Sequence, residues 1–213
     1  MLRYRLTRAA ELAEASYQGA DAPVIRKQLK SSLSEQDVEA HILNDGTLLI
    51  PGSNSVMDYV RYNLRVQRIG KQRLKLNTVA GVTWHQGFLA HAKVVQDWIR
   101  REKHDVTFII GHSLGAATAQ ILSAGWDEPA VGFAAPRTCR TASALTAAKR
   151  CLLVNRTDDT VCAVPSNYQH LGKVEACRPR ARASGMSHSM KHYRKIVDEG
   201  LAARRLPEIW PAR

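Results

Sequence analysis

The chain has 213 residues, of which 45% are hydrophobic and 23% are charged, and this balance excludes an intrinsically disordered protein. Its length suits one domain with a sizeable core, and no stretch approaches the roughly 20 apolar residues of a membrane-spanning helix. The 31 Lys and Arg residues outnumber the 19 Asp and Glu residues, which gives a net charge of +12. This charge favours contact with polyanions such as nucleic acid or anionic lipid, but it does not select one of them.

The cysteines do not indicate a zinc site, because none of them belongs to a C-x-x-C pair. The sequence from Met1 to Arg8 lacks the apolar run of a secretory signal. We therefore expect a cytoplasmic protein with reduced cysteines, unless the sequence is that of a mature secreted form. We expect neither a metal nor a cofactor.

Apolar spacing predicts helices and strands that alternate along the chain. Helical spacing occurs over residues 7–17, 88–101 and 114–124. Residues 38–50 predict a β-hairpin, because Asp45-Gly46 readily supplies the positive φ angles of a tight turn. Apolar runs without alternation, typical of strands buried on both faces, occur over 106–110, 130–134 and 151–154. This order predicts an α/β fold with a mostly parallel sheet, formed by a single domain over residues 1–213.

Gly111-His112-Ser113-Leu114-Gly115 matches the G-x-S-x-G pattern of a nucleophile elbow. The predicted strand before it and the predicted helix after it supply the strand–turn–helix setting that this motif requires. The turn is so sharp that a side chain at either glycine would collide with neighbouring backbone. Ser113 is therefore the candidate nucleophile, and the alternative is a glycine-rich turn with an inert serine.

A serine hydroxyl is a weak nucleophile, so it needs a base, and the base needs an orienting carboxylate. In hydrolases with this elbow, the acid and then the histidine follow the serine along the chain. Asp158 and Asp159 come after the predicted strand 151–154, where a loop would carry either side chain to the carboxyl edge of the sheet. The downstream histidines are His170, His188 and His192, and chain order alone does not choose among them.

Further segments accompany the elbow in a specific order: Leu48-Leu49-Ile50-Pro51-Gly52-Ser53 with Asp58-Tyr59 and Asn63-Leu64, His85-Gln86-Gly87-Phe88-Leu89, Gly132-Phe133-Ala134-Ala135-Pro136-Arg137, Val154-Asn155 through Asp159-Thr160-Val161 to Val164-Pro165, Tyr168-Gln169-His170-Leu171-Gly172, and His188-Ser189-Met190 with Tyr193. With the elbow, they resemble the class 3 lipase family, the fungal triacylglycerol lipase-like α/β-hydrolases. The resemblance implies an α/β-hydrolase fold, in which helices flank a mostly parallel central sheet.

The resemblance also implies that Ser113 is the nucleophile, His188 the general base and Asp159 the acid that orients it. The family's acid lies two residues before a valine, which here is Val161 and selects Asp159. Counting from Asn155 instead would select Asp158. We take Asp159, and we expect a structural role for His170 and a solvated or packing role for His192.

Two further features follow from the resemblance. The N–H groups of Leu114 and Ser53 would form an oxyanion hole, which stabilises the negative charge on the attacked carbonyl oxygen. Residues 55–68 would form a mobile lid with one apolar helical face (Val56, Val60, Leu64) and one basic face (Arg61, Arg65, Arg68). Such a helix suits an anionic membrane surface, and the alternative is an ordinary amphipathic helix with a solvated basic face.

We therefore expect a serine hydrolase, a lipase or esterase, that cleaves carboxylic esters through an acyl-serine intermediate. The alternatives among enzymes are a phospholipase A1 acting on anionic membrane lipids and a short-chain carboxylesterase. The alternative of another class is a catalytically inert hydrolase fold that binds nucleic acid or another polyanion. Neither zinc-finger spacing nor a basic helix interleaved with aromatic residues supports it. The expected partners are ester or lipid substrates, with transient contact to anionic membranes and none to nucleic acid.

Overall fold

The structure is a computed structural model, and it describes residues 2–52, 83–140, 149–181 and 187–212. A seven-stranded sheet with the order β2-β3-β4-β5-β6-β7-β8 forms its centre. Its strands are β2 (Leu29–Glu35), β3 (Val38–Leu43), β4 (Thr47–Ile50), β5 (Phe108–His112), β6 (Ala130–Phe133), β7 (Cys151–Arg156) and β8 (Lys173–Cys177). β2, β3 and β4 pair antiparallel, whereas β4 to β8 pair in parallel. The carboxyl ends of the parallel strands therefore meet at one edge of the sheet.

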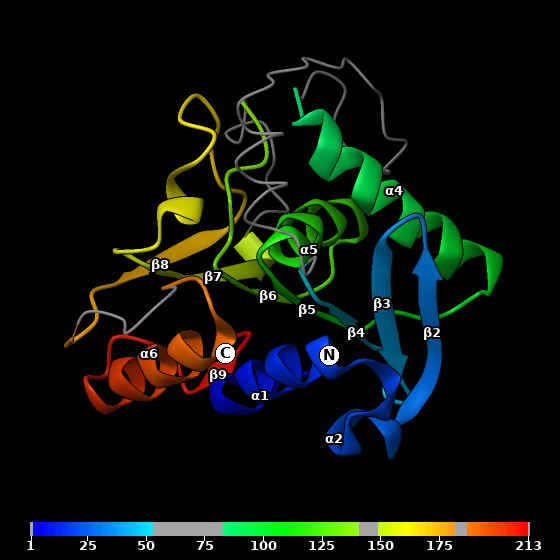
Figure 1. Ribbon diagram of the computed structural model, residues 1–213, viewed down its shortest axis with the longest axis horizontal. Helices are drawn as coiled ribbons and strands as arrows, with labels where there is room; N and C mark the ends of the chain where they lie inside the picture. The colour runs from blue at the N-terminus through cyan, green and yellow to red at the C-terminus, as the bar shows by residue number, and fades with distance from the viewer. Residues whose placement is uncertain (1, 53–82, 141–148, 182–186, 213) are drawn as a thin grey trace.

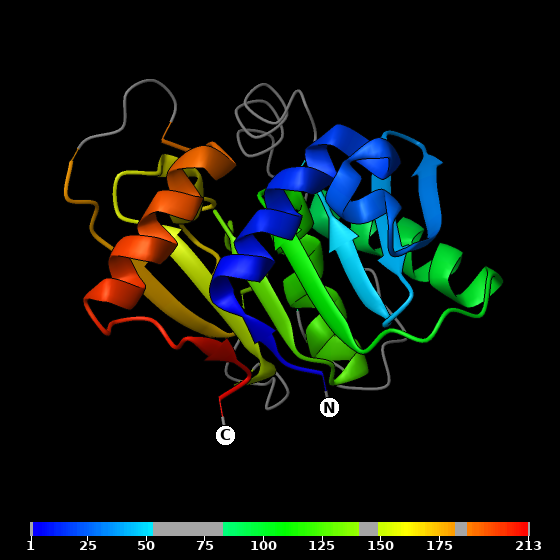
Figure 2. The same cartoon turned by 90° about the horizontal axis from the view of Figure 1, so that it is seen from below.

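Helices cover both faces of this sheet (Figures 1 and 2). α4 (Gln86–Arg101) and α5 (Leu114–Trp126) pack on one face, and α1 (Leu6–Ala15) and α6 (Met190–Ala202) pack on the other. The short α2 (Pro23–Arg26) follows α1 after a 3-10 turn, and β1 (Tyr4–Arg5) pairs with β9 (Ile209–Trp210) in a separate two-stranded sheet. Neighbouring strand residues face opposite layers, since Ile109 packs with α4 and α5 while Ile110 packs with α1 and α6.

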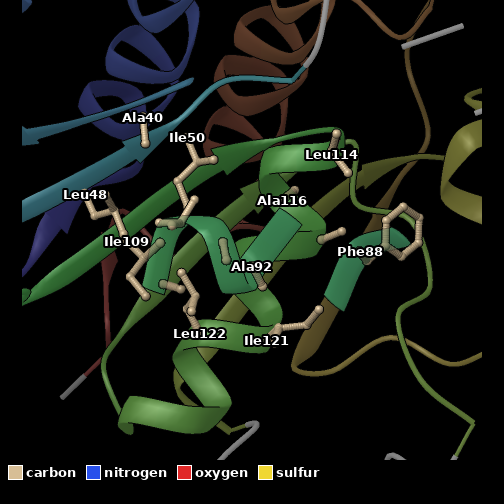
Figure 3. Packing of buried hydrophobic residues seen from close by; sticks show 14 of the residues in the cluster. Ala40, Leu48, Ile50, Phe88, Ala92, Ile109, Leu114, Ala116, Ile121 and Leu122 are labelled. Atoms are coloured by element: carbon tan, nitrogen blue, oxygen red, sulfur yellow. The ribbon is translucent and has the colours of Figure 1, made fainter. Parts of the chain in front are cut away.

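α5 is buried from Leu114 to Ala124, which is the expected position for a helix that is apolar nearly all round. Small residues such as Ala116 let it lie close to the sheet. In the core on this side, Ile50 and Ile109 from the sheet share one apolar cluster with Leu122 of α5 (Figure 3). The helix that follows the elbow is thus enclosed by the core over most of its length.

The α/β fold predicted from the sequence is confirmed, with small shifts of the elements. The predicted hairpin corresponds to β3 and β4, and Gly46 in its turn has a φ of +83°. β5 begins and ends later than the predicted 106–110, because its pairing with β6 continues to His112 opposite Phe133. β2, β8 and α6 were not predicted. No helix within the described ranges is long and apolar enough to cross a membrane.

Candidate active site

Ser113 lies at the sharp turn between β5 and α5. It has a φ of 56° and a ψ of −117°, a backbone conformation that costs free energy for a residue with a side chain. A methyl group at Gly111 would collide with the backbone of Gly115, and one at Gly115 would collide with the carbonyl of Ile50. Both glycines of the motif are therefore required by close approaches of the backbone, which hold the strained turn in place.

Ser113, His188 and Asp159 form one chain of hydrogen bonds, although they lie far apart in the sequence. Ser113 Oγ is 2.7 Å from His188 Nε2, and His188 Nδ1 is 2.8 Å from Asp159 Oδ2. Because an ionised carboxylate only accepts, Nδ1 donates to Asp159 and leaves Nε2 to accept the Ser113 hydroxyl proton. All three residues are buried, so these interactions act in a medium of low dielectric constant. The structure thus brings together the three residues singled out in the sequence.

Asp159 is held by two donors besides His188. Its Oδ1 accepts the N–H of Val161 at 3.0 Å, and its Oδ2 accepts the hydroxyl of Tyr193 at 2.8 Å. Burial would raise the pKa of Asp159, but the hydrogen bond and charge of His188, together with the bonds from Tyr193 and Val161, outweigh it. The pKa of Asp159 therefore lies below its ordinary value, and the carboxylate is ionised at neutral pH.

Asp158, the neighbouring carboxylate, has a different partner. Its two oxygens accept Nε and Nη2 of Arg156 at 3.0 and 2.9 Å. Arg156 is only 3% exposed, so Asp158 neutralises a buried cation at the end of β7. Asp159, which its spacing from Val161 selected in the sequence, is therefore the carboxylate that reaches His188.

The other downstream histidines bind elsewhere. His170 Nε2 donates to the carbonyl of Ala135 at 2.9 Å and so joins two loops at the sheet edge. Burial lowers the pKa of His170, which favours the neutral ring. The carbonyl of His192 accepts Arg156 Nη1 at 3.3 Å, and its side chain is half-buried. Of the three candidates, His188 is the one whose ring bonds Ser113.

His112 is a buried residue of the site that the sequence analysis passed over. Its Nε2 donates to the backbone carbonyl of His188 at 2.9 Å. Burial, and then the charge of His188, lower the pKa of His112 to about 3, so the ring is neutral at neutral pH. The sequence signal was weak, because His112 occupies the first variable position of the elbow, which the motif leaves unspecified.

The described part of the predicted oxyanion hole lies beside Ser113. Leu114 is the first residue of α5, so its N–H has no acceptor within the helix. The chain at the end of β4 lies close to Ser113, since a Cβ at Gly52 would lie 2.9 Å from the Cβ of Ser113. The predicted second donor, Ser53, and the predicted lid over 55–68 lie outside the described residues.

The described side chains offer nucleophilic and acid–base chemistry. Within residues 2–52, 83–140, 149–181 and 187–212, no group of three or more His, Cys, Asp and Glu side chains could hold a metal ion. The four cysteines, all of which lie within the described ranges, are buried thiols that form no disulfide. Burial raises the pKa of the Cys151 and Cys162 thiols, which therefore stay protonated at neutral pH.

Solved structures of fungal lipases share this architecture. Lipase II from Rhizopus niveus superposes with a TM-score of 0.60 and 18% identity, over 84% of this chain and 80% of its own. A triacylglycerol lipase from Penicillium expansum gives 0.54 and 20%, over 86% and 80%. Lip2 lipase from Yarrowia lipolytica gives 0.57 and 16%, over 78% and 77%.

No protein-family model matches this sequence, and the comparison with curated proteins finds no match. The likeness to the solved lipases, at 14–20% identity, concerns the fold. The chain therefore has the α/β-hydrolase fold of the class 3 lipases, as the resemblance of its sequence implied.

Proposed function

We propose that this protein is a serine hydrolase that cleaves carboxylic esters, with Ser113 as nucleophile, His188 as general base and Asp159 as the orienting acid. The observation that carries the proposal is the buried chain from Ser113 Oγ through His188 to Asp159, with distances of 2.7 and 2.8 Å. A glycine-rich turn with an inert serine gives no reason for an imidazole and a carboxylate to stand in line behind the hydroxyl. The fold shared with fungal lipases supports the same class.

In the first half of the proposed reaction, His188 Nε2 takes the hydroxyl proton while Ser113 Oγ attacks the ester carbon. The electron pair of the carbonyl moves onto its oxygen. The N–H groups of Leu114 and Ser53 donate to that oxygen and stabilise its negative charge. The ionised Asp159 stabilises the imidazolium that forms at the same moment.

In the second half, the tetrahedral intermediate collapses and His188 gives its proton to the departing alcohol, which leaves an acyl ester on Ser113. Water then enters, and His188 Nε2 takes a proton from it as its oxygen attacks the acyl carbon. Collapse of this second intermediate releases the carboxylic acid, and His188 returns the proton to Ser113. Each step uses the same pair of atoms, Ser113 Oγ and His188 Nε2.

For the substrate, we infer lipid esters. The solved relatives are named as lipases, and the one from Penicillium expansum as a triacylglycerol lipase. The net charge of +12, and the arginines at 61, 65 and 68 of the predicted lid, favour an anionic surface and so keep a phospholipase A1 as the second candidate.

A panel of esters tests the proposal. Rates on nitrophenyl esters of increasing acyl length, on triacylglycerol emulsion and on anionic phospholipid vesicles separate an esterase, a lipase and a phospholipase. The Ser113→Ala variant removes the hydroxyl of a buried residue without adding volume, so we expect the wild-type circular dichroism spectrum and no ester cleavage. Undiminished cleavage by the folded Ser113→Ala variant would contradict the proposed nucleophile.

The positive charge also supports the candidate of another class, an inert fold that binds a polyanion. Binding of DNA that weakens steeply with added salt, in a protein that cleaves no ester in the panel, would favour that candidate. Fluorescence anisotropy of a labelled duplex at low and high salt measures it. Under the hydrolase proposal, ester cleavage persists at salt concentrations that abolish any DNA binding.

A further inference from the structure

A partly buried bridge of hydrogen bonds connects the end of β4 to the backbone of His188. It consists of two side chains that take no part in the proposed proton transfers, Tyr17 and His112. The Tyr17 hydroxyl accepts the N–H of Gly52 at 2.9 Å and lies 2.5 Å from His112 Nδ1, while His112 Nε2 lies 2.9 Å from the carbonyl oxygen of His188. The ring of His112 packs against the rings of Tyr17, His188 and Tyr193, with centroids 5.5, 5.0 and 5.8 Å away.

Donors and acceptors along this bridge can be assigned in one direction. A carbonyl oxygen only accepts, so His112 Nε2 carries a proton and donates to His188. Because burial and the charge of His188 keep His112 neutral, its Nδ1 has no proton and accepts the hydroxyl of Tyr17. The Tyr17 oxygen in turn accepts from Gly52. Each of these polar groups has a partner, and removal of one side chain would take one hydrogen bond from each of its neighbours.

The bridge joins segments that no local sequence connects. Tyr17 lies in the 3-10 turn Ser16–Asp21 after α1, 95 residues before His112. A Cβ at Gly52 would come within 2.5 Å of the Tyr17 hydroxyl and 2.9 Å of the Ser113 Cβ, so these groups are in tight contact. The end of β4 therefore cannot shift against the nucleophile without disturbing the bridge.

Resting on the proposed function, we propose that Tyr17 and His112 are positioning residues of the hydrolase. They hold the backbone of His188, and with it the base, in register with the Gly52 end of β4, from which the chain continues to the second oxyanion residue. A displacement of about 1 Å in an active site can cost about a hundredfold in rate. The hydrogen bond of 2.7 Å between His188 Nε2 and Ser113 Oγ depends on such positioning.

Tyr4 provides a matched control at the opposite end of β4. Its hydroxyl bonds Asp45 Oδ2 at 2.8 Å and Thr47 Oγ1 at 2.7 Å, where β4 begins. Tyr4→Phe and Tyr17→Phe thus remove the same atom, each at one end of the same strand and each with two hydrogen bonds. A merely structural role of Tyr17 predicts that both variants lose stability and keep their turnover number.

The first experiment compares kcat and KM of both variants on a soluble nitrophenyl ester, with rates divided by active sites titrated with a phosphonate. We expect Tyr17→Phe to lower kcat about ten- to a hundredfold with little change in KM, because the chemical step loses its alignment. Tyr4→Phe should retain the kcat of the wild type. Equal kcat values for Tyr17→Phe, Tyr4→Phe and the wild type would overturn the proposal.

A double-variant cycle adds a readout that independent structural losses would not produce. His112→Gln keeps an amide N–H that can donate to His188, as His112 Nε2 does, but places no acceptor at the position of Nδ1, to which Tyr17 donates. If both side chains act through one bridge, the combined Tyr17→Phe and His112→Gln variant loses no more activity than the single variant with the larger loss. If the fold-loss of activity in the combined variant equals the product of the two single losses, the two side chains act independently and the proposed bridge is wrong.

Spectra of 15N-labelled histidines test the bridge without any substrate. We expect Tyr17→Phe to shift the ring signals of His112 and His188, and Tyr4→Phe to leave both in place. A wild type that cleaves no ester yet shows these shifts would contradict the proposed function and support the bridge. An active wild type whose His188 signals do not respond to Tyr17→Phe would contradict the bridge alone.

Discussion

The two helical layers of this protein differ in what they bring to the carboxyl edge of the sheet. The layer of α4 and α5 buries an apolar cluster and contributes one backbone group to the site, the N–H of Leu114. The layer of α1 and α6 also packs apolar side chains, but its ends supply Tyr17, His188 and Tyr193. The proposed nucleophile follows a strand of the sheet, and the proposed base comes from the α1–α6 layer. Activity should therefore depend on the register between the sheet and the α1–α6 layer, and the other layer should govern stability.

The largest effect is expected where the α1–α6 layer meets the acid. Asp159→Asn removes the charge that orients His188 and should lower kcat by about three to four decades, as in triad enzymes generally. Asp158→Asn is the matched control, because it changes the adjacent carboxylate, which pairs with Arg156. It should lower the free energy of unfolding and leave kcat within about tenfold. A larger loss of kcat in Asp158→Asn than in Asp159→Asn would show that Asp158, and not Asp159, is the acid.

In the α4–α5 layer, we expect a loss of stability without a loss of activity. Leu122 is fully buried in α5, and Leu122→Ala leaves a cavity in the apolar cluster. The free energy of unfolding, measured with urea, should fall by about 2–5 kcal/mol. At a temperature where the variant is folded, kcat should equal that of the wild type. A drop in kcat of the folded variant would show that this layer also sets the register of the site.

A smaller effect on stability is expected at low pH, from a histidine in the α4–α5 layer. Burial lowers the pKa of His91 from 6.5 to about 4, and His91 Nδ1 lies 2.7 Å from Thr118 Oγ1 between α4 and α5. Below pH 6.5 the unfolded chain binds a proton there and the folded chain does not, so stability falls as the pH falls. Between pH 8 and pH 5 this group should account for about 2 kcal/mol of lost stability.

His91→Gln tests this contribution, because glutamine does not titrate. Urea unfolding at pH 8 and pH 5 should show a smaller pH dependence in the variant than in the wild type. The kcat of the variant at pH 8 should be unchanged, since His91 bonds Thr118 and has no role in the proposed proton transfers. An identical pH dependence in both proteins would mean that His91 is not held neutral by burial.

The smallest expected effect sharpens the comparison from the side of α6. Tyr193→Phe removes one of the donors to Asp159 and the acceptor of the Arg156 N–H. Loss of one hydrogen bond to a charged group, about 1.4 kcal/mol, corresponds to about a tenfold lower kcat. Leu122→Ala should thus cost more stability than Tyr193→Phe and less activity. The kcat and the urea unfolding of both variants measure this. A larger loss of kcat in Leu122→Ala than in Tyr193→Phe would contradict the division between the two layers.

Local patterns made the elbow and much of the fold predictable. Gly111 to Gly115 lie within one turn, and a side chain at either glycine would collide with the backbone that packs against it, as the motif implies. α6 was predictable too, because its buried positions Met190, Tyr193, Ile196 and Val197 have helical spacing that the sequence analysis did not use. β8 was not, because it is an edge strand in which Cys177 alone is buried, so it shows no apolar run.

Other parts of the site depend on contacts that no local pattern encodes. The sequence allowed either Asp158 or Asp159 to face His188. The choice depends on the turn in which the N–H of Asp159 bonds the carbonyl of Arg156, and Asp159 then caps the 3-10 turn Thr160–Ala163. The contact between Tyr17 and His112 arises only when the turn after α1 packs at the end of β4 and β5.

The central claim is that His188 activates Ser113, and labelling with a fluorophosphonate tests it most directly. Such reagents react with a serine that a base has made nucleophilic. Intact mass and peptide mapping should show one adduct per wild-type chain, on Ser113, and the labelling rate should fall about a thousandfold or more in His188→Gln. Absence of an adduct on the wild type, an adduct on another serine, or an equal rate in His188→Gln would contradict the claim.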